Sequence, residues 1–139
     1  MPLRLTVNRN DPDYLYMQVH ASDEHVSIST HIYVGHGKLK EAVAGLERFR
    51  HEVHGGVFDL NFGIFGPKYA SGALHLRLAF QARGHINMTM RVQTEFAALG
   101  AEEVASEATL HSTTVVCLLD DFVRAMQAMS DGFCDEAQL

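Results

Sequence analysis

Residues 74–96 constrain the fold more than any other part of this chain. Apolar and polar side chains alternate along them with a period of two, and Arg83-Gly84-His85 interrupts the alternation near its middle. A period of two is typical of a strand with one buried face, so the pattern predicts a long β-hairpin. A three-residue turn would place Phe80 opposite Met88 and all the apolar side chains on one face of the hairpin.

The same alternation predicts a second hairpin nearer the N-terminus. It runs through residues 14–21, stops at four polar residues, and resumes over residues 26–34. A four-residue loop would place Tyr14 opposite Tyr33 and leave the tyrosines on the polar face.

The rest of the chain supplies shorter strands and two amphipathic segments with helical spacing. Gly45 lies inside the first of these segments, where it costs up to about 1 kcal/mol relative to alanine. The predicted elements are a short edge strand over residues 3–8, a helix over 38–53, a strand over 58–64, a strand near 104–110, and a closing helix of about sixteen residues capped by Ser112 or Thr113.

This order of elements predicts an α+β fold. Consecutive hairpins favour a mostly antiparallel sheet, and we expect six to seven strands with two helices packed on one face. The chain length suits a single domain, which we place at residues 1–132, and residues 133–139 are expected to form a flexible C-terminal tail.

Charge and composition narrow the possible partners. Seventeen acidic residues against eleven basic ones give a net charge of −6, which disfavours nucleic acid as a partner. Cys117 and Cys134 do not have the spacing of a metal-binding or redox motif. Cys117 lies within the closing helix, and its thiol is expected to be packed against the core. We find neither a signal peptide nor a stretch long enough to cross a bilayer, so no membrane contact and a cytoplasmic location are expected.

The polar face of the predicted sheet is the strongest candidate for a binding surface. It is rich in tyrosine and arginine and poor in lysine, which is typical of the centres of protein interfaces. A solvated sheet face would explain the same residues on strand propensity alone. The candidate partner-binding residues are Tyr14, Tyr16, His20, His31, Tyr33, His75, Arg77 and Arg91.

Two of these candidates raise a charge problem. The predicted register places Arg77 directly opposite Arg91, and like charges so placed destabilise a sheet by about 0.2–1 kcal/mol. An acidic group must therefore lie close to them. Asp59 on a neighbouring strand and an acidic group on a partner are the two alternatives.

Nine histidines suggest metal binding as an alternative function. Glu47, His51 and His54 would line one helix face, but an HExxH motif is lacking and solvated side chains explain the spacing equally well. No serine or cysteine occurs in a nucleophile motif, and no acid and base pair stands out. We therefore expect no cofactor, no metal site and no enzymatic activity.

A set of segments in fixed order carries a resemblance to a known family. They are the hairpin of residues 15–21 and 26–34, the helix of 39–53, the aromatic strand of 58–64, the hairpin of 74–96, and the closing helix led by Ser112. This layout resembles the WapI-type bacterial immunity proteins. The resemblance implies a non-enzymatic protein that binds and blocks a toxin domain, usually a basic one, and it assigns no individual binding residue.

Two classes of function therefore remain. The first is a cytoplasmic protein-binding module from a bacterium. Its partner is a toxin domain, or a second copy of the chain in a homodimer. The second is a histidine-rich metal-binding or enzymatic domain.

Overall fold

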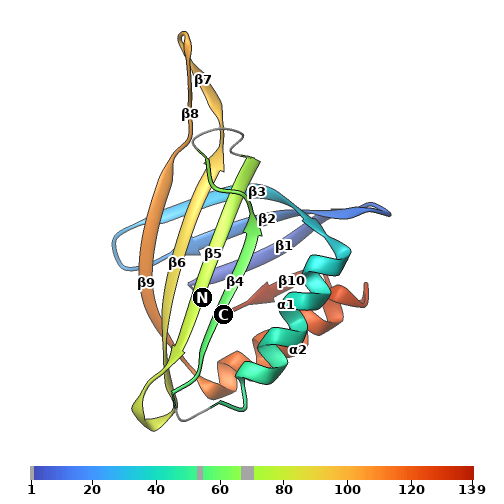
Figure 1. Ribbon diagram of the computed structural model, residues 1–139, viewed down its shortest axis with the longest axis vertical. Helices are drawn as coiled ribbons and strands as arrows, with labels where there is room; N and C mark the ends of the chain where they lie inside the picture. The colour runs from blue at the N-terminus through green and yellow to red at the C-terminus, as the bar shows by residue number, and fades with distance from the viewer. Residues whose placement is uncertain (1, 53–54, 67–70) are drawn as a thin grey trace.

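The computed structural model describes residues 2–52, 55–66 and 71–139 (Figure 1). Over these residues the chain forms two α-helices, ten strands and one short 3-10 turn. The helices are α1 (His36–Phe49) and α2 (Val116–Ser130), and the turn is η1 (Ala82–Gly84). The strands are β1 (Leu3–Asn10), β2 (Tyr14–Ser22), β3 (Ser27–Gly35), β4 (Val57–Gly63), β5 (Ser71–Phe80), β6 (His85–Glu95), β7 (Ala97–Leu99), β8 (Glu102–Val104), β9 (Glu107–Val115) and β10 (Glu136–Gln138).

The strands belong to three antiparallel sheets. The first sheet has the order β10-β1-β2-β3, the second has the order β4-β5-β6-β9, and β7 pairs with β8 alone. The α+β class and the antiparallel pairing are as predicted, but the expected single sheet of six to seven strands is replaced by two four-stranded sheets and a small hairpin. Figure 1 shows the strands of the two larger sheets crossing at a steep angle.

The two large sheets approach most closely where β3 crosses the start of β5. A Cβ on Gly72 would lie 2.1 Å from the backbone oxygen of His31, and one on Gly63 would lie 2.1 Å from the oxygen of Gly72. Both glycines also have positive φ angles, +89° and +75°. Glycine is therefore required at both positions for two reasons: it allows the positive φ angle, and it allows the close contact between backbones.

The apolar faces of both sheets contribute to one core. Buried side chains of β2, β3, β5 and β6 pack in a single cluster with those of the two helices. Helix α1 lies beside β3 and β4, α2 lies beside β9 and β10, and the helices pack against each other. The helices thus complete an enclosure formed by two sheets, whereas we expected them to cover one face of a single sheet. No helix in the described part of the chain has the length and apolarity needed to cross a membrane.

Both large hairpins pair two residues away from the predicted register. Tyr16 faces Tyr33 and Phe80 faces Ile86. A shift of two residues keeps each side chain on its predicted face, because the side-chain period of a strand is two. The cause lies in the turns: Arg83 takes a left-handed φ of 64° within η1, and Asp23 closes the β2–β3 turn.

Asp23 holds the β2–β3 turn with its side chain. Its Oδ1 accepts hydrogen bonds from the backbone N–H groups of His25 (2.8 Å) and Val26 (2.9 Å). Its Oδ2 lies 3.4 Å from the N–H of His111 on β9, the edge strand of the second sheet. One carboxylate therefore closes a turn and satisfies a donor on an open sheet edge.

Gly45, which appears unfavourable in the sequence, is explained by packing between α1 and β4. A Cβ on Gly45 would lie 2.5 Å from Cε2 of Phe58. The absence of a side chain lets the Phe58 ring rest on the helix backbone, and Phe58 in turn packs on Phe49 with ring centroids 5.9 Å apart.

The chain termini and the second helix differ from prediction in two further places. Ser112 and Thr113 belong to β9 and do not cap α2, whose N-cap is Val115, because β9 pairs with β6 along its whole length. The expected flexible tail contains β10, which pairs with β1, and its residue Leu139 is 1% exposed. The predicted end of the first helix, Val53, lies outside the described residues.

Candidate protein-binding surface

The structure divides the predicted surface between two sheet faces. Polar side chains of each sheet point away from the shared core, so the two polar faces lie on different sides of the molecule. The first sheet carries Tyr14, Tyr16, His20, His31 and Tyr33, and the second sheet carries His75, Arg77 and Arg91.

Four aromatic side chains of the first sheet form a continuous group of ring-to-ring contacts. Tyr14 and Tyr33 meet edge to face with ring centroids 5.0 Å apart, and Tyr33 lies 4.8 Å from Tyr16. Tyr16 stacks on His31 at 5.0 Å with an interplanar angle of 6°, and the guanidinium of Arg9 lies 5.5 Å from the Tyr16 ring. We call these five residues the tyrosine face.

The pairing of β2 with β3 and β1 explains why these residues meet. Tyr16 lies opposite Tyr33 on β3 and opposite Arg9 on β1, while Tyr14 and His31 flank the Tyr16–Tyr33 pair diagonally. Cross-strand and diagonal neighbours are the pairs that interact on a sheet surface. The register of the first sheet therefore assembles the group without help from a loop.

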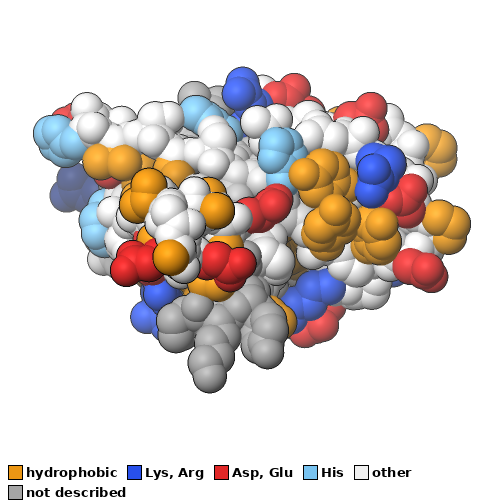
Figure 2. All heavy atoms as spheres, turned by 90° about the horizontal axis from the view of Figure 1, so that it is seen from above, with side chains coloured by type: hydrophobic (Ala, Val, Ile, Leu, Met, Phe, Trp, Pro, Cys, Tyr) orange, Lys and Arg blue, Asp and Glu red, His pale blue; other side chains and the backbone are white. Residues whose placement is uncertain are grey.

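The tyrosine face is accessible to another molecule. Tyr33 is 51% exposed, and Tyr14 and Tyr16 are half-buried. Desolvation, and then the negative charge of Glu95, raises the pKa of Tyr16 above its ordinary value. Figure 2 views the molecule from above and gives tyrosine the same colour as the hydrophobic side chains. A group of this colour lies beside a histidine and among basic and acidic side chains.

His20 lies on the same sheet but does not join this group of ring-to-ring contacts. Its Nδ1 lies 2.6 Å from the hydroxyl of Ser29 and its Nε2 lies 3.4 Å from that of Ser27. These contacts occupy both ring nitrogens, so we regard His20 as a border residue of the face.

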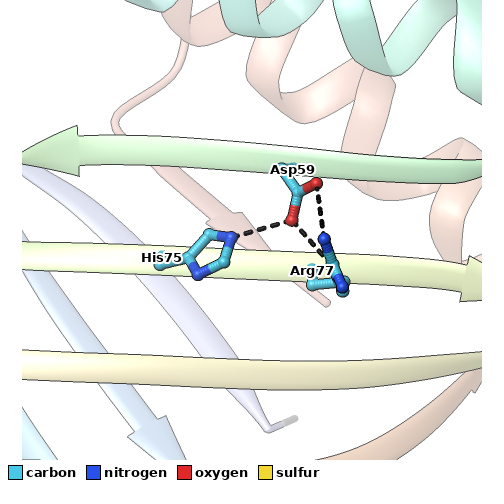
Figure 3. A network of polar contacts seen from close by, with 3 residues as sticks. All are labelled: Asp59, His75 and Arg77. Carbon is cyan, nitrogen blue, oxygen red and sulfur yellow. Dashed lines mark hydrogen bonds and ion pairs between the residues drawn. The ribbon is translucent and has the colours of Figure 1, made fainter.

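The second sheet holds a network of charges around Asp59 (Figure 3). Arg77 donates to both carboxylate oxygens, with Nε 2.9 Å from Oδ1 and Nη2 3.2 Å from Oδ2. His75 Nε2 lies 2.8 Å from the same Oδ1. The hydrogen bond from Arg77, followed by that from His75, holds the pKa of Asp59 below its ordinary value despite partial desolvation.

Arg91 is also paired within the molecule. Its Nε donates to Glu107 on β9, and its guanidinium lies 4.1 Å from the centroid of the Phe65 ring. The structure places Arg77 opposite Thr89 and not opposite Arg91, so the predicted repulsion does not arise. Of the two acidic partners considered, Asp59 is the one that neutralises Arg77.

The structure does not bring together the residues considered as metal ligands. Within residues 2–52, 55–66 and 71–139, no group of three or more His, Cys, Asp or Glu is arranged to hold a metal ion. Glu47 pairs with Arg50 at 3.4 Å, and His54 lies outside the described residues. Cys117 is exposed rather than packed as predicted, because it falls on the outer side of α2.

Sequence reasoning missed two features of this region. Arg9 lies beyond the edge strand predicted over residues 3–8, although β1 continues to Asn10 across a register shift between Val7 and Arg9. Residues 99–103, which none of the predicted elements covers, belong to the β7–β8 hairpin. The signal for the hairpin was present, since Gly100 separates two short runs in the manner of a tight turn.

Comparison with known proteins adds no relative. No protein-family model matches this chain, and no curated protein or solved structure is significantly similar to it.

Proposed function

We propose that this chain is a non-enzymatic protein-binding module that docks its partner on the tyrosine face. The observation that carries the proposal is the group of ring-to-ring contacts among Tyr14, Tyr16, Tyr33 and His31 on an uncovered sheet face. Rings already fixed by their neighbours lose little conformational freedom when a partner covers them.

The second sheet is a weaker candidate for the same role. Arg77 and Arg91 already have acidic partners within the chain. An external carboxylate would have to displace an internal one, which removes much of its gain in binding. The docking surface therefore centres on the first sheet, and His75, Arg77 and Arg91 serve to hold the second sheet together.

Among protein-binding roles, we favour that of a cytoplasmic bacterial immunity protein that neutralises a toxin domain. The net charge of −6 suits a basic target, since complementary charge speeds encounter between partners. The layout that resembles WapI-type immunity proteins supports the same role. A second copy of the chain is the competing partner.

The test compares two double variants at matched, solvent-facing positions. Tyr16→Ala/Tyr33→Ala removes the centre of the tyrosine face, and Asn87→Ala/Thr109→Ala trims the exposed face of the second sheet as a control. Each protein is co-expressed with the product of the adjacent gene and purified by an affinity tag.

We expect the wild type and the control to retain the partner and to protect the host cell, and the tyrosine variant to do neither. Sedimentation at two concentrations distinguishes a homodimer, which would dissociate in the tyrosine variant. Full capture and protection by the tyrosine variant, with its thermal melting unchanged, would exclude this face as the docking surface.

A further inference from the structure

A two-stranded hairpin extends beyond the body of the molecule. β7 and β8 pair only with each other among the described strands, and Figure 1 shows them projecting past the ends of β6 and β9. We call residues 95–104 the arm. Gly100, with a φ of +63°, occupies the first of the two turn positions between Leu99 and Glu102, where a type II′ turn has a positive φ.

The arm is anchored firmly at its base. The N–H of Thr94 donates to the oxygen of Ser106 at 2.8 Å, and the N–H of Ser106 donates to Oγ1 of Thr94 at 2.9 Å. An isolated two-stranded hairpin is marginally stable in water. This anchor therefore sets the direction in which the arm projects.

One side of the arm is mainly apolar and exposed. Ala97 pairs with Val104 and Leu99 pairs with Glu102, so alternation places Ala97, Leu99, Val104 and Glu102 on one side and Glu103 on the other. Leu99 is 67% exposed and Val104 is 38% exposed. A partner that covered these two side chains would remove their remaining apolar surface from water, which favours binding.

The charge of the arm selects the kind of partner. Residues 92–110 contain four glutamates and neither lysine, arginine nor histidine. Glu107 is neutralised by Arg91, whereas Glu95, Glu102 and Glu103 form no ion pair with another described residue. Within the described part of the chain, the arm therefore presents three negative charges without an ion-pair partner beside its apolar side chains.

The arm and the tyrosine face adjoin each other. Glu95, the first residue of the arm, lies close enough to Tyr16 for its charge to raise the pKa of that phenol. Figure 2, which looks down on the end of the molecule from which the arm projects, also shows the hydrophobic group described above. A single partner can contact both surfaces.

We infer that the arm inserts into a concave, basic site on the protein that docks on the tyrosine face. This inference rests on the proposed function and names the chemistry of its partner: a pocket lined by lysine or arginine with an apolar floor. Leu99 and Val104 pack on the apolar floor of this pocket, and Glu102 and Glu103 form ion pairs with the basic side chains at its rim. The catalytic cleft of a basic enzyme has this shape and charge.

The test uses a defined probe, an acetylated and amidated peptide of alternating lysine and leucine, titrated into the 15N-labelled full chain. The arm variant is Glu102→Gln/Glu103→Gln, and the matched control is Glu24→Gln/Glu41→Gln, which removes the same charge from exposed sites elsewhere. A Leu99→Ser variant tests the apolar contribution. All five positions are exposed, so the spectrum of the body should not change.

We expect amide shifts on the arm and around Tyr16 and Tyr33. Affinity should fall roughly fivefold to tenfold in the arm variant and in Leu99→Ser, and remain unchanged in the control. It should also fall when ionic strength rises from about 0.01 M to about 0.15 M, which shortens the Debye length from about 30 Å to about 8 Å.

The other outcomes separate the inference from the proposed function. Shifts on the tyrosine face alone, with the arm variant binding like wild type, overturn the inference and leave the proposed function standing. Shifts on the arm alone overturn both, because the inference requires one partner to contact the arm and the tyrosine face together. Absence of binding, or equal loss in the arm variant and the control, overturns the inference.

Discussion

Replacing Gly45 by alanine should destabilise the protein, although the same change stabilises most helices. Alanine is favoured over glycine in a helix interior by about 1 kcal/mol. At this position, however, the new methyl group would lie 2.5 Å from Cε2 of the Phe58 ring, well inside van der Waals contact. Forcing an extra carbon into a packed site costs about 1–3 kcal/mol.

These opposing effects give a net loss of up to about 2 kcal/mol in Gly45→Ala. The sign should reverse when the ring is removed. In a Phe58→Ala background the helix preference acts alone, and Gly45→Ala should stabilise the protein by about 1 kcal/mol. The coupling between the two positions should therefore be about 1–3 kcal/mol.

Urea unfolding followed by circular dichroism measures these four free energies. Gly37, in the first turn of α1, provides a control because a Cβ there meets nothing within 4 Å. Gly37→Ala should have the same effect in both backgrounds. Stabilisation by Gly45→Ala in the wild-type background, or an equal effect with and without the Phe58 ring, would refute the packing argument.

Three further predictions concern Asp23, Asp59 and the C-terminus. Asp23→Ala removes the acceptor of two N–H groups in the β2–β3 turn and should lower the free energy of unfolding, measured by urea titration. Because its pKa is depressed in the folded state, Asp59 stabilises the protein above the ordinary aspartate pKa of about 3.9, and this contribution is lost as the pH falls further. The difference in melting temperature between wild type and Asp59→Asn should therefore be largest near neutral pH and should close in acid; a constant difference would contradict the assignment. Leu139→Ala should destabilise by about 2–5 kcal/mol in thermal unfolding because the side chain is 1% exposed, whereas a flexible tail would show no effect.

The sequence predicts which way each side chain points better than it predicts which strands meet. Alternation placed Tyr16 and Tyr33 on a polar face, and they lie there. Their partners were shifted by two residues, because the turn decides the pairing and its geometry depends on Asp23, whose hydrogen bonds a hydrophobic pattern does not contain.

The division into two sheets could not be obtained from alternation at all. A period of two says that one face is buried, but a facing sheet buries it as well as a layer of helices does. The available signals were Gly63 and Gly72, at the end of one strand and near the start of the next. Their meaning depends on the crossing of β3, which is a tertiary contact.

Tertiary pairing also explains the misplaced helix start. Ser112 and Thr113 are good capping residues, yet serine and threonine also fit a strand surface, and the partner strand β6 is long enough to pair with both. The candidate surface was half predicted for the same reason. Its tyrosines were identified, while Arg77 and Arg91 joined them only under the assumption of one sheet.

The crossing at Gly72 bears on how this protein could acquire new specificities. Ile32 lies wedged between the two glycines, so positions 32, 63 and 72 tolerate almost no change. The neighbouring positions 31 and 33 face outward on the same strand and carry no such restriction. Substitutions on the tyrosine face can therefore accumulate while the crossing of the two sheets stays fixed.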